Sequence, residues 1–156
     1  MVTTNVMRIL EKQKIPFSAR EYEWDENDLS GVNAADKLGL PVEQVFKTLV
    51  GQGDKTGHCV FVIPVAEELD LKKCAAASGN KRVELIHVKE LLPLTGYIRG
   101  GCSPVGMKKP FPTYLHETAG LFDSIYVSAG QRGLQFRLAP ADLIAVTGAT
   151  VCDITV

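Results

Sequence analysis

The apolar run HCVFVIPV, residues 58–65, constrains the fold of this chain more than any other stretch. Valine, phenylalanine and isoleucine fill most of it, and it lacks the polar alternation of a strand with one face in water. It therefore predicts a strand buried on both faces, at the centre of a sheet. A second apolar run, residues 45–50 (VFKTLV), predicts another buried strand, and this strand contains a lysine, Lys47.

Short helices and short strands alternate along the rest of the chain. Asp70 caps one predicted helix, Gly39 ends another, and Pro140 lies in the first turn of the last. Because the strands show no regular βαβ spacing, we expect a mixed sheet in an α+β fold, not a doubly wound one. Helices are predicted over 5–14, 32–40, 41–45 (one turn), 69–79, 88–96 and 139–148; extended segments over 17–24, 82–87, 113–117, 124–130, 134–140 and 150–156; and a loop rich in Gly and Pro over 98–112.

Length and composition bound the class of protein. The 156 residues, 46% of them hydrophobic, fit one folded domain spanning residues 1–156. No apolar stretch reaches the roughly 18–20 residues of a membrane span, and the first residues do not resemble a secretory signal, so we expect a soluble cytoplasmic protein with no membrane partner. The four cysteines show neither a CxxC motif nor nearby paired histidines, which argues against a metal site and predicts no metal or other cofactor.

Charge is unevenly distributed. Residues 72–137 hold ten Lys/Arg and four Asp/Glu, whereas residues 1–71 hold seven and twelve. This basic segment could form a patch for phosphate groups, or its charges could be scattered and solvated.

Lys47 is the first candidate for chemistry. In a strand, side chains alternate between faces, so Lys47 shares a face with Val45 and Leu49. Burial of an unpaired ammonium group costs several kcal/mol. Lys47 must therefore reach an anion or a cleft, or lie on an edge strand with its ammonium group in water.

Glycine-rich loops supply the other candidates. GGCSPVG, residues 100–106, can aim backbone N–H groups at a phosphate or a developing oxyanion, or can be a tight turn. VSAGQRG, residues 127–133, fits a hairpin loop, and Ser128 does not lie in a G-x-S-x-G motif. The three histidines show no obvious serine partner, and Cys102 shows no nearby histidine that would activate it.

Taken together, the segments VFKTLV, TGYIRGGCSPVGMKKPFPT and IYVSAGQRGL resemble the YbaK/EbsC family, in order and separation. The likeness runs from about residue 9 to residue 156, and the glycine loop with its two lysines resembles the Cys-tRNA(Pro) deacylase branch. The family comprises relatives of the editing domain of bacterial prolyl-tRNA synthetase. The resemblance implies a single mixed α/β domain with a bent, barrel-like sheet.

The resemblance also implies an activity and a set of site residues. It implies hydrolysis of the ester that joins cysteine to tRNA(Pro), with the substrate thiol attacking its own ester. It implies as partners the 3′ acceptor end of an aminoacyl-tRNA and prolyl-tRNA synthetase. The implied catalytic groups are Lys47 and the Gly101 backbone, and the implied substrate-binding residues are Tyr22, Gly100, Ser103, Pro104, Ser128 and Gln135.

The sequence departs from the family pattern at one position, and it is compatible with two alternative functions. Several relatives carry Asp where this chain has Gln135, which argues against a mechanism that needs a carboxylate there. The first alternative is an alanyl-tRNA(Pro) deacylase that uses an activated water. The second is a module that binds tRNA or a synthetase without catalysis.

Overall fold

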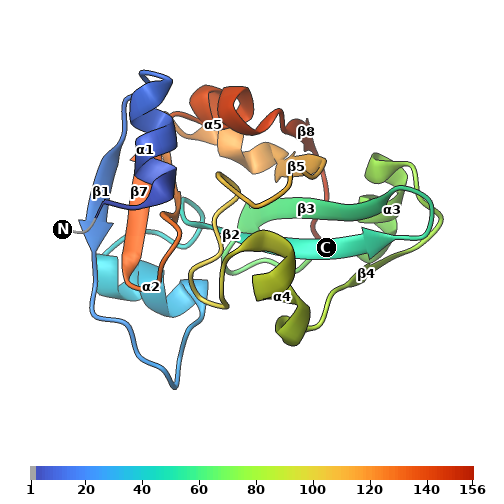
Figure 1. Cartoon of the computed structure of the whole chain (residues 1–156), viewed down its shortest axis with the longest axis horizontal. Helices are drawn as coiled ribbons and strands as arrows, with labels where there is room; N and C mark the ends of the chain where they lie inside the picture. Colours follow the sequence, from blue (N-terminus) through green and yellow to red (C-terminus); the bar gives the residue numbers. More distant parts are fainter. Residues whose placement is uncertain (1–2) are drawn as a thin grey trace.

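The computed structural model describes residues 3–156. Short helices and short strands are interspersed along it (Figure 1). The helices are α1 (Asn5–Lys12), α2 (Gly31–Leu38), α3 (Leu71–Ser78), α4 (Val88–Thr95) and α5 (Pro140–Thr147), with one 3₁₀ turn, η1 (Glu117–Leu121). The strands are β1 (Ser18–Glu21), β2 (Phe46–Gly53), β3 (Gly57–Pro64), β4 (Val83–Leu85), β5 (Thr113–His116), β6 (Ile125–Ser128), β7 (Leu134–Leu138) and β8 (Thr150–Cys152).

Local sequence signals set most of the helix ends. The Thr4 hydroxyl accepts a hydrogen bond from the Met7 N–H and caps α1. The Asp70 carboxylate accepts from the N–H groups of Lys72 and Lys73 and caps α3, as predicted. Each cap satisfies N–H groups that have no partner within the first helical turn.

The strands form two sheets joined at one point. Five strands pair in the order β4-β2-β3-β5-β8, and three pair in the order β1-β7-β6. The β3–β5 and β5–β8 pairs are parallel and the others antiparallel, so the larger sheet is mixed, which confirms the predicted α+β class. A single bridge between Val45 and Tyr126 links the sheets. The bend implied by the family resemblance is thus a junction between two sheets.

Strand β3 lies inside the larger sheet, between β2 and β5, as its apolar run predicts. The alternate residues Val60 and Val62 face the main core, together with Phe46 and Val50 of β2. Phe61 faces a second apolar cluster on the opposite side of the sheet. All of these side chains are nearly inaccessible to solvent, so β3 is buried on both faces.

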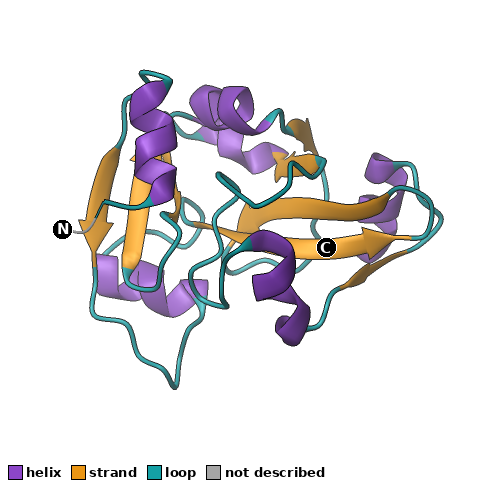
Figure 2. Cartoon of the chain, in the orientation of Figure 1, coloured by secondary structure: helices purple, strands orange, loops and turns teal. Residues whose placement is uncertain are grey.

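Strand β2 leaves half of one edge open. It pairs with β3 along its whole length, but β4 pairs only with its last three residues, Gly51–Gly53. In the described part of the chain, no strand pairs with residues 47–49 on that side, and the Val50 carbonyl accepts from the Ile86 N–H over 3.1 Å. Figure 2 shows that loops occupy the region between the two sheets next to this edge. The edge is therefore available to form one wall of a site.

Two local predictions were wrong. Residues 41–45 form a hydrogen-bonded turn, in which the Gln44 N–H donates to the Pro41 carbonyl, and not a helical turn. The last strand ends at Cys152, and beyond it only Thr155 forms an isolated bridge, with Leu69. No helix in the described part of the chain is long and apolar enough to span a membrane.

Candidate active site

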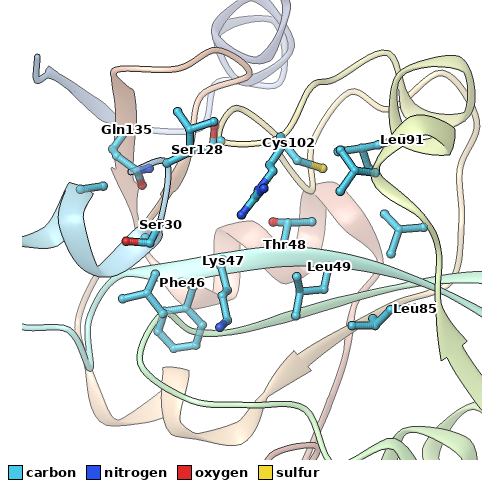
Figure 3. A pocket seen from close by; sticks show the side chains of 18 of the residues that line it. Ser30, Phe46, Lys47, Thr48, Leu49, Leu85, Leu91, Cys102, Ser128 and Gln135 are labelled. Carbon is cyan, nitrogen blue, oxygen red and sulfur yellow. The ribbon is translucent and has the colours of Figure 1, made fainter. Parts of the chain in front are cut away.

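A pocket of about 350 Å³ opens beside the unpaired half of β2. This volume lies within the range of about 300–1,000 Å³ that is usual for small-molecule sites. Strands β2, β6 and β7, helices α2 and α4, and the loop after α4 line it. Figure 3 shows Ser128, Gln135 and Cys102 across the pocket from β2; the Thr48 side chain lies on their side of the strand and the Lys47 side chain on the other. The fold thus brings together residues that lie far apart in the sequence.

Lys47 lies in the pocket wall with its ammonium group unpaired. Its strand partner is Ile63, a core residue, so it shares an apolar face, as alternation predicts. Within residues 3–156 the ammonium group makes no hydrogen bond and no ion pair. Partial burial lowers the pKa of Lys47 below its usual 10.5, and the charges of Glu68 and Glu67 oppose that shift. The ammonium group is therefore partly desolvated and has no bound counterion.

The glycine loop begins with a tight turn that lines the same pocket as Lys47. The Gly101 N–H donates to the Ile98 carbonyl over 2.9 Å, and Gly100 between them has a φ of 86°. This positive φ is the conformation that the third position of a type II turn requires of glycine. A Cβ on Gly101 would lie 2.9 Å from backbone atoms of Gln131 and Arg132. Gly101 therefore permits a close backbone approach, and its N–H is occupied within the turn.

Gly100 and Cys102 are the residues of the 100–106 loop that line the pocket. In the described part of the chain, neither backbone N–H has a hydrogen-bond partner. Ser103 is fully buried, and its hydroxyl accepts from the Val105 N–H over 3.2 Å. Pro104 is buried beside it, and the structure brings neither Ser103 nor Pro104 into the lining. These two residues therefore belong to the buried part of the loop and not to the pocket wall.

Tyr22, Ser128 and Gln135 do line the pocket, together with Lys47 and Gly100. Ser128 and Gln135 are cross-strand partners in the β6–β7 pair, and the Ser128 hydroxyl accepts from the Gly130 N–H. Gln135 is 6% exposed, and its side-chain oxygen is buried without a hydrogen-bond partner. Since nearly all buried polar atoms in proteins are hydrogen-bonded, such an oxygen is typical of a binding site.

No protein nucleophile is evident among the described residues. Burial raises the pKa of the Cys102 thiol to about 12, which keeps it protonated near neutral pH. His116 is buried, and its Nδ1 accepts from the Ile154 N–H over 3.3 Å, so it is structural. His87 does line the pocket, at the N-terminus of α4, but within residues 3–156 it makes no hydrogen bond to Ser128.

Arg99 and Thr48 are polar pocket residues that the sequence analysis did not single out. The Thr48 hydroxyl is buried without a partner, like the Gln135 oxygen. Arg99 directly precedes the paired glycines in the sequence, and this position could have identified it as a pocket residue. Lys108 and Lys109, the two lysines that follow the glycine loop, are exposed and lie outside the lining. Among the described residues, the lining contains Lys47 and Arg99 and no carboxylate.

The chain is similar in sequence to known proteins. The sequence matches the aminoacyl-tRNA editing domain family over residues 29–146. It is 53% identical, over 97% of this chain and 93% of the relative, to an Enterococcus faecalis protein described as a candidate Cys-tRNA(Pro)/Cys-tRNA(Cys) deacylase, EbsC.

Solved structures show the same fold. A candidate trans-editing enzyme for prolyl tRNA synthetase is 28% identical, with a TM-score of 0.82 and 99% of each chain covered. The hypothetical protein APE2540 has a TM-score of 0.88, with 98% of this chain and all of the other covered; at 22% identity it supports the fold alone. On the extent of these matches, the chain belongs to the aminoacyl-tRNA editing domain family.

Proposed function

We propose that this protein acts in trans to hydrolyse the ester that joins cysteine to tRNA(Pro), and that residues 1–156 act as one editing domain. One observation carries the proposal: a pocket with two cations and no carboxylate among its described lining residues, beside a glycine turn, in a chain 53% identical to a candidate Cys-tRNA(Pro)/Cys-tRNA(Cys) deacylase.

The need for such an enzyme follows from the limits of recognition by size. Cysteine and proline are close in volume, and hydrophobic selection between similar substrates supplies only about 1–3 kcal/mol. A prolyl-tRNA synthetase therefore attaches some cysteine in error. A second, hydrolytic site removes the error before the product reaches the ribosome.

Lys47 is the principal binding group in this proposal. Its unpaired ammonium group lies in the wall of the pocket and can donate to phosphate or ribose oxygens of the terminal adenosine. Tyr22 and Ser128 border the space for the aminoacyl group, and Gln135 offers its unpartnered oxygen to the same space.

Backbone N–H groups of the glycine loop stabilise the carbonyl oxygen as it gains negative charge. Because the Gly101 N–H is bound to the Ile98 carbonyl, the N–H groups of Gly100 and Cys102 are the available donors. Fixed donors of this kind are effective because they need no reorganisation as charge develops. Gly101 contributes by letting the loop approach the β6–β7 turn closely.

The substrate's own thiol supplies the nucleophile. Its sulfur attacks the ester carbonyl, the C–O bond to the ribose breaks, and the thiol proton goes to the ribose oxygen. The product is a cyclic thiolactone, which water then opens to free cysteine. This route requires no nucleophilic side chain, in agreement with the high pKa of Cys102. It also selects cysteine over amino acids that lack a thiol.

A deacylation panel tests the proposal. Cysteine, serine, alanine and proline esters of tRNA(Pro), together with cysteinyl-tRNA(Cys), are incubated with the protein, and release of each amino acid is followed. We expect rapid loss of cysteine and far slower loss of serine. Preferential loss of alanine would indicate an alanyl-tRNA deacylase that uses an activated water. Binding of tRNA without loss of any amino acid would indicate a non-catalytic module.

We place the protein in the cytoplasm, where tRNA is charged, with prolyl-tRNA synthetase as its partner. If the protein binds the tRNA through its basic segment, its affinity for tRNA falls steeply as the salt concentration rises. Equal rates on cysteinyl-tRNA(Pro) and cysteinyl-tRNA(Cys) would mean that the protein does not itself read the tRNA, and that the synthetase supplies this specificity.

A further inference from the structure

Arg99 is a cation of the pocket to which the activity described above assigns no role. It lines the pocket together with Lys47, yet its side chain is exposed. Within residues 3–156 its guanidinium group has no hydrogen-bond or ion-pair partner; only its backbone carbonyl is engaged. An arginine held at a pocket mouth without a counterion is ready to bind an anion.

The backbone of Arg99 is fixed from both sides. On one side it lies within the Ile98–Gly101 turn, which is closed by a 2.9 Å hydrogen bond. On the other side, Arg132 Nε donates to the Arg99 carbonyl over 2.9 Å. The Arg132 guanidinium in turn lies over the Trp24 ring, 5.3 Å from its centroid. A side chain whose backbone is already held in place loses less conformational freedom when it binds a ligand. The turn therefore preorganises Arg99 for binding.

The charge of the lining defines the kind of ligand. Two cations, Lys47 and Arg99, share one pocket that has no carboxylate among its described lining residues. An anion that enters the pocket can be bound by either cation. A guanidinium group is planar and presents parallel N–H donors, which match two oxygens of one phosphate group. Lys47 presents a single charged point.

The size of the pocket indicates which phosphate reaches Arg99. A volume of about 350 Å³ suits an aminoacyl nucleoside and leaves the rest of the RNA outside. Counting from the ester, the first anion along a tRNA is the 5′ phosphate of the terminal adenosine. It lies where the buried part of the substrate meets the solvent, and Arg99 is the exposed cation of the two.

We propose that Arg99 binds the phosphodiester between the last two nucleotides of the tRNA through two parallel hydrogen bonds. Lys47, the less exposed cation, then serves the ribose and the ester. This assignment rests on the proposed function. It gives the phosphate contact to Arg99 and leaves the ribose and ester contacts to Lys47. Arg99 is a substrate-binding residue that sets the depth to which the 3′ end enters.

The experiment compares substrates with and without that phosphate. Three substrates are used: cysteinyl-tRNA(Pro), 3′-O-cysteinyl adenosine 5′-methylphosphate and 3′-O-cysteinyl adenosine. For Arg99→Gln we expect KM to rise about 10- to 100-fold on the first two, with little change in kcat, because a charge-assisted pair is lost. On the third substrate Arg99→Gln should match the wild type within twofold. Arg99→Lys should fall between the two.

Arg137→Gln is the matched control, since Arg137 is an exposed arginine of β7 outside the pocket and its loss changes the net charge equally. It should match the wild type on all three substrates. An equal loss for Arg99→Gln on substrates with and without the phosphate would overturn the proposal, as would no loss on any of them.

A binding measurement tests Arg99 even if the wild type releases no amino acid, an outcome that would refute the proposed function only. The Kd of a labelled RNA hairpin with a single-stranded CCA end is measured from 50 to 300 mM salt. Loss of one phosphate contact should reduce the slope of log Kd against log salt by about 0.7 for Arg99→Gln. An unchanged slope would overturn the assignment of Arg99 to a phosphate.

Discussion

Replacement of Lys47 by methionine isolates the charge of this residue from its bulk. Methionine retains an unbranched chain of similar length, so the apolar stem still packs beside Ile63. A hydrogen bond between a charged group and its ligand contributes about 1.5–3 kcal/mol. At about 1.4 kcal/mol per factor of ten, kcat/KM should fall about 10- to 150-fold.

The assay follows release of labelled cysteine from cysteinyl-tRNA(Pro) over a range of substrate concentrations below and above KM. Lys81→Met serves as the control, because Lys81 is exposed and lies outside the pocket. Equal kcat/KM for Lys47→Met and the wild type would refute the role of the ammonium group. An equal loss in both variants would point instead to general attraction of the tRNA.

For Lys47→Met we expect stability to change in the opposite direction from activity. The pKa of Lys47 is lower in the folded protein than the usual 10.5, chiefly because burial penalises the charged form. The wild type therefore carries a cost at neutral pH, which eases as the pH rises through the lowered pKa towards 10.5. Lys47→Met should melt at or above the wild-type Tm at pH 7, with a smaller gain at pH 10–11. A Tm several degrees lower at pH 7 would show that the ammonium group stabilises the fold.

Three further predictions concern the loop, the thiol and a surface ion pair. Gly101→Ala should destabilise the fold by about 1–3 kcal/mol in urea unfolding, because its Cβ would meet backbone atoms at 2.9 Å, whereas Gly120→Ala, with open space, should not. Alkylation of Cys102 should be slow at pH 8 and rise about tenfold per pH unit until about pH 12, in peptide-resolved mass spectrometry; a plateau near pH 8 would contradict this. The hydrogen bond from Lys73 lowers the pKa of Asp153 below its usual 3.8. The stability that this pair contributes is therefore present above pH 3.8 and is lost as the pH falls below it. Lys73→Met should accordingly lower Tm at pH 7 more than at pH 2.5.

The sequence located the central strand and most of the helices because their signals are local. An apolar run such as that of β3 needs burial on both faces wherever it is placed. The Asp70 cap of α3 acts within one helical turn. Where local signals are weak, the predictions were wrong: the proline at position 41 opens a turn and not a helix, and residues 153–156 do not continue the last strand.

Strand alternation also showed, without any structure, that Lys47 shares an apolar face, but it could not distinguish a cleft from an open edge. That distinction depends on where β4 stops pairing with β2, which is a long-range property. The same holds for the loop. The paired glycines indicated a close approach, but only the structure shows that Gly101 meets the backbone at Gln131, thirty positions later in the chain.

The sequence by itself determined the fold class, the family and the candidates Lys47, Ser128 and Gln135, because each depends on residue type and order. The tertiary structure alone decided which of the candidates share a pocket. It placed Arg99 in the same pocket lining as Lys47, left Ser103 buried outside that lining, and engaged the Gly101 N–H within a turn. The physical reason is that a pocket is formed where chain segments fail to fill space or pair an edge, and no local pattern records which segments those will be.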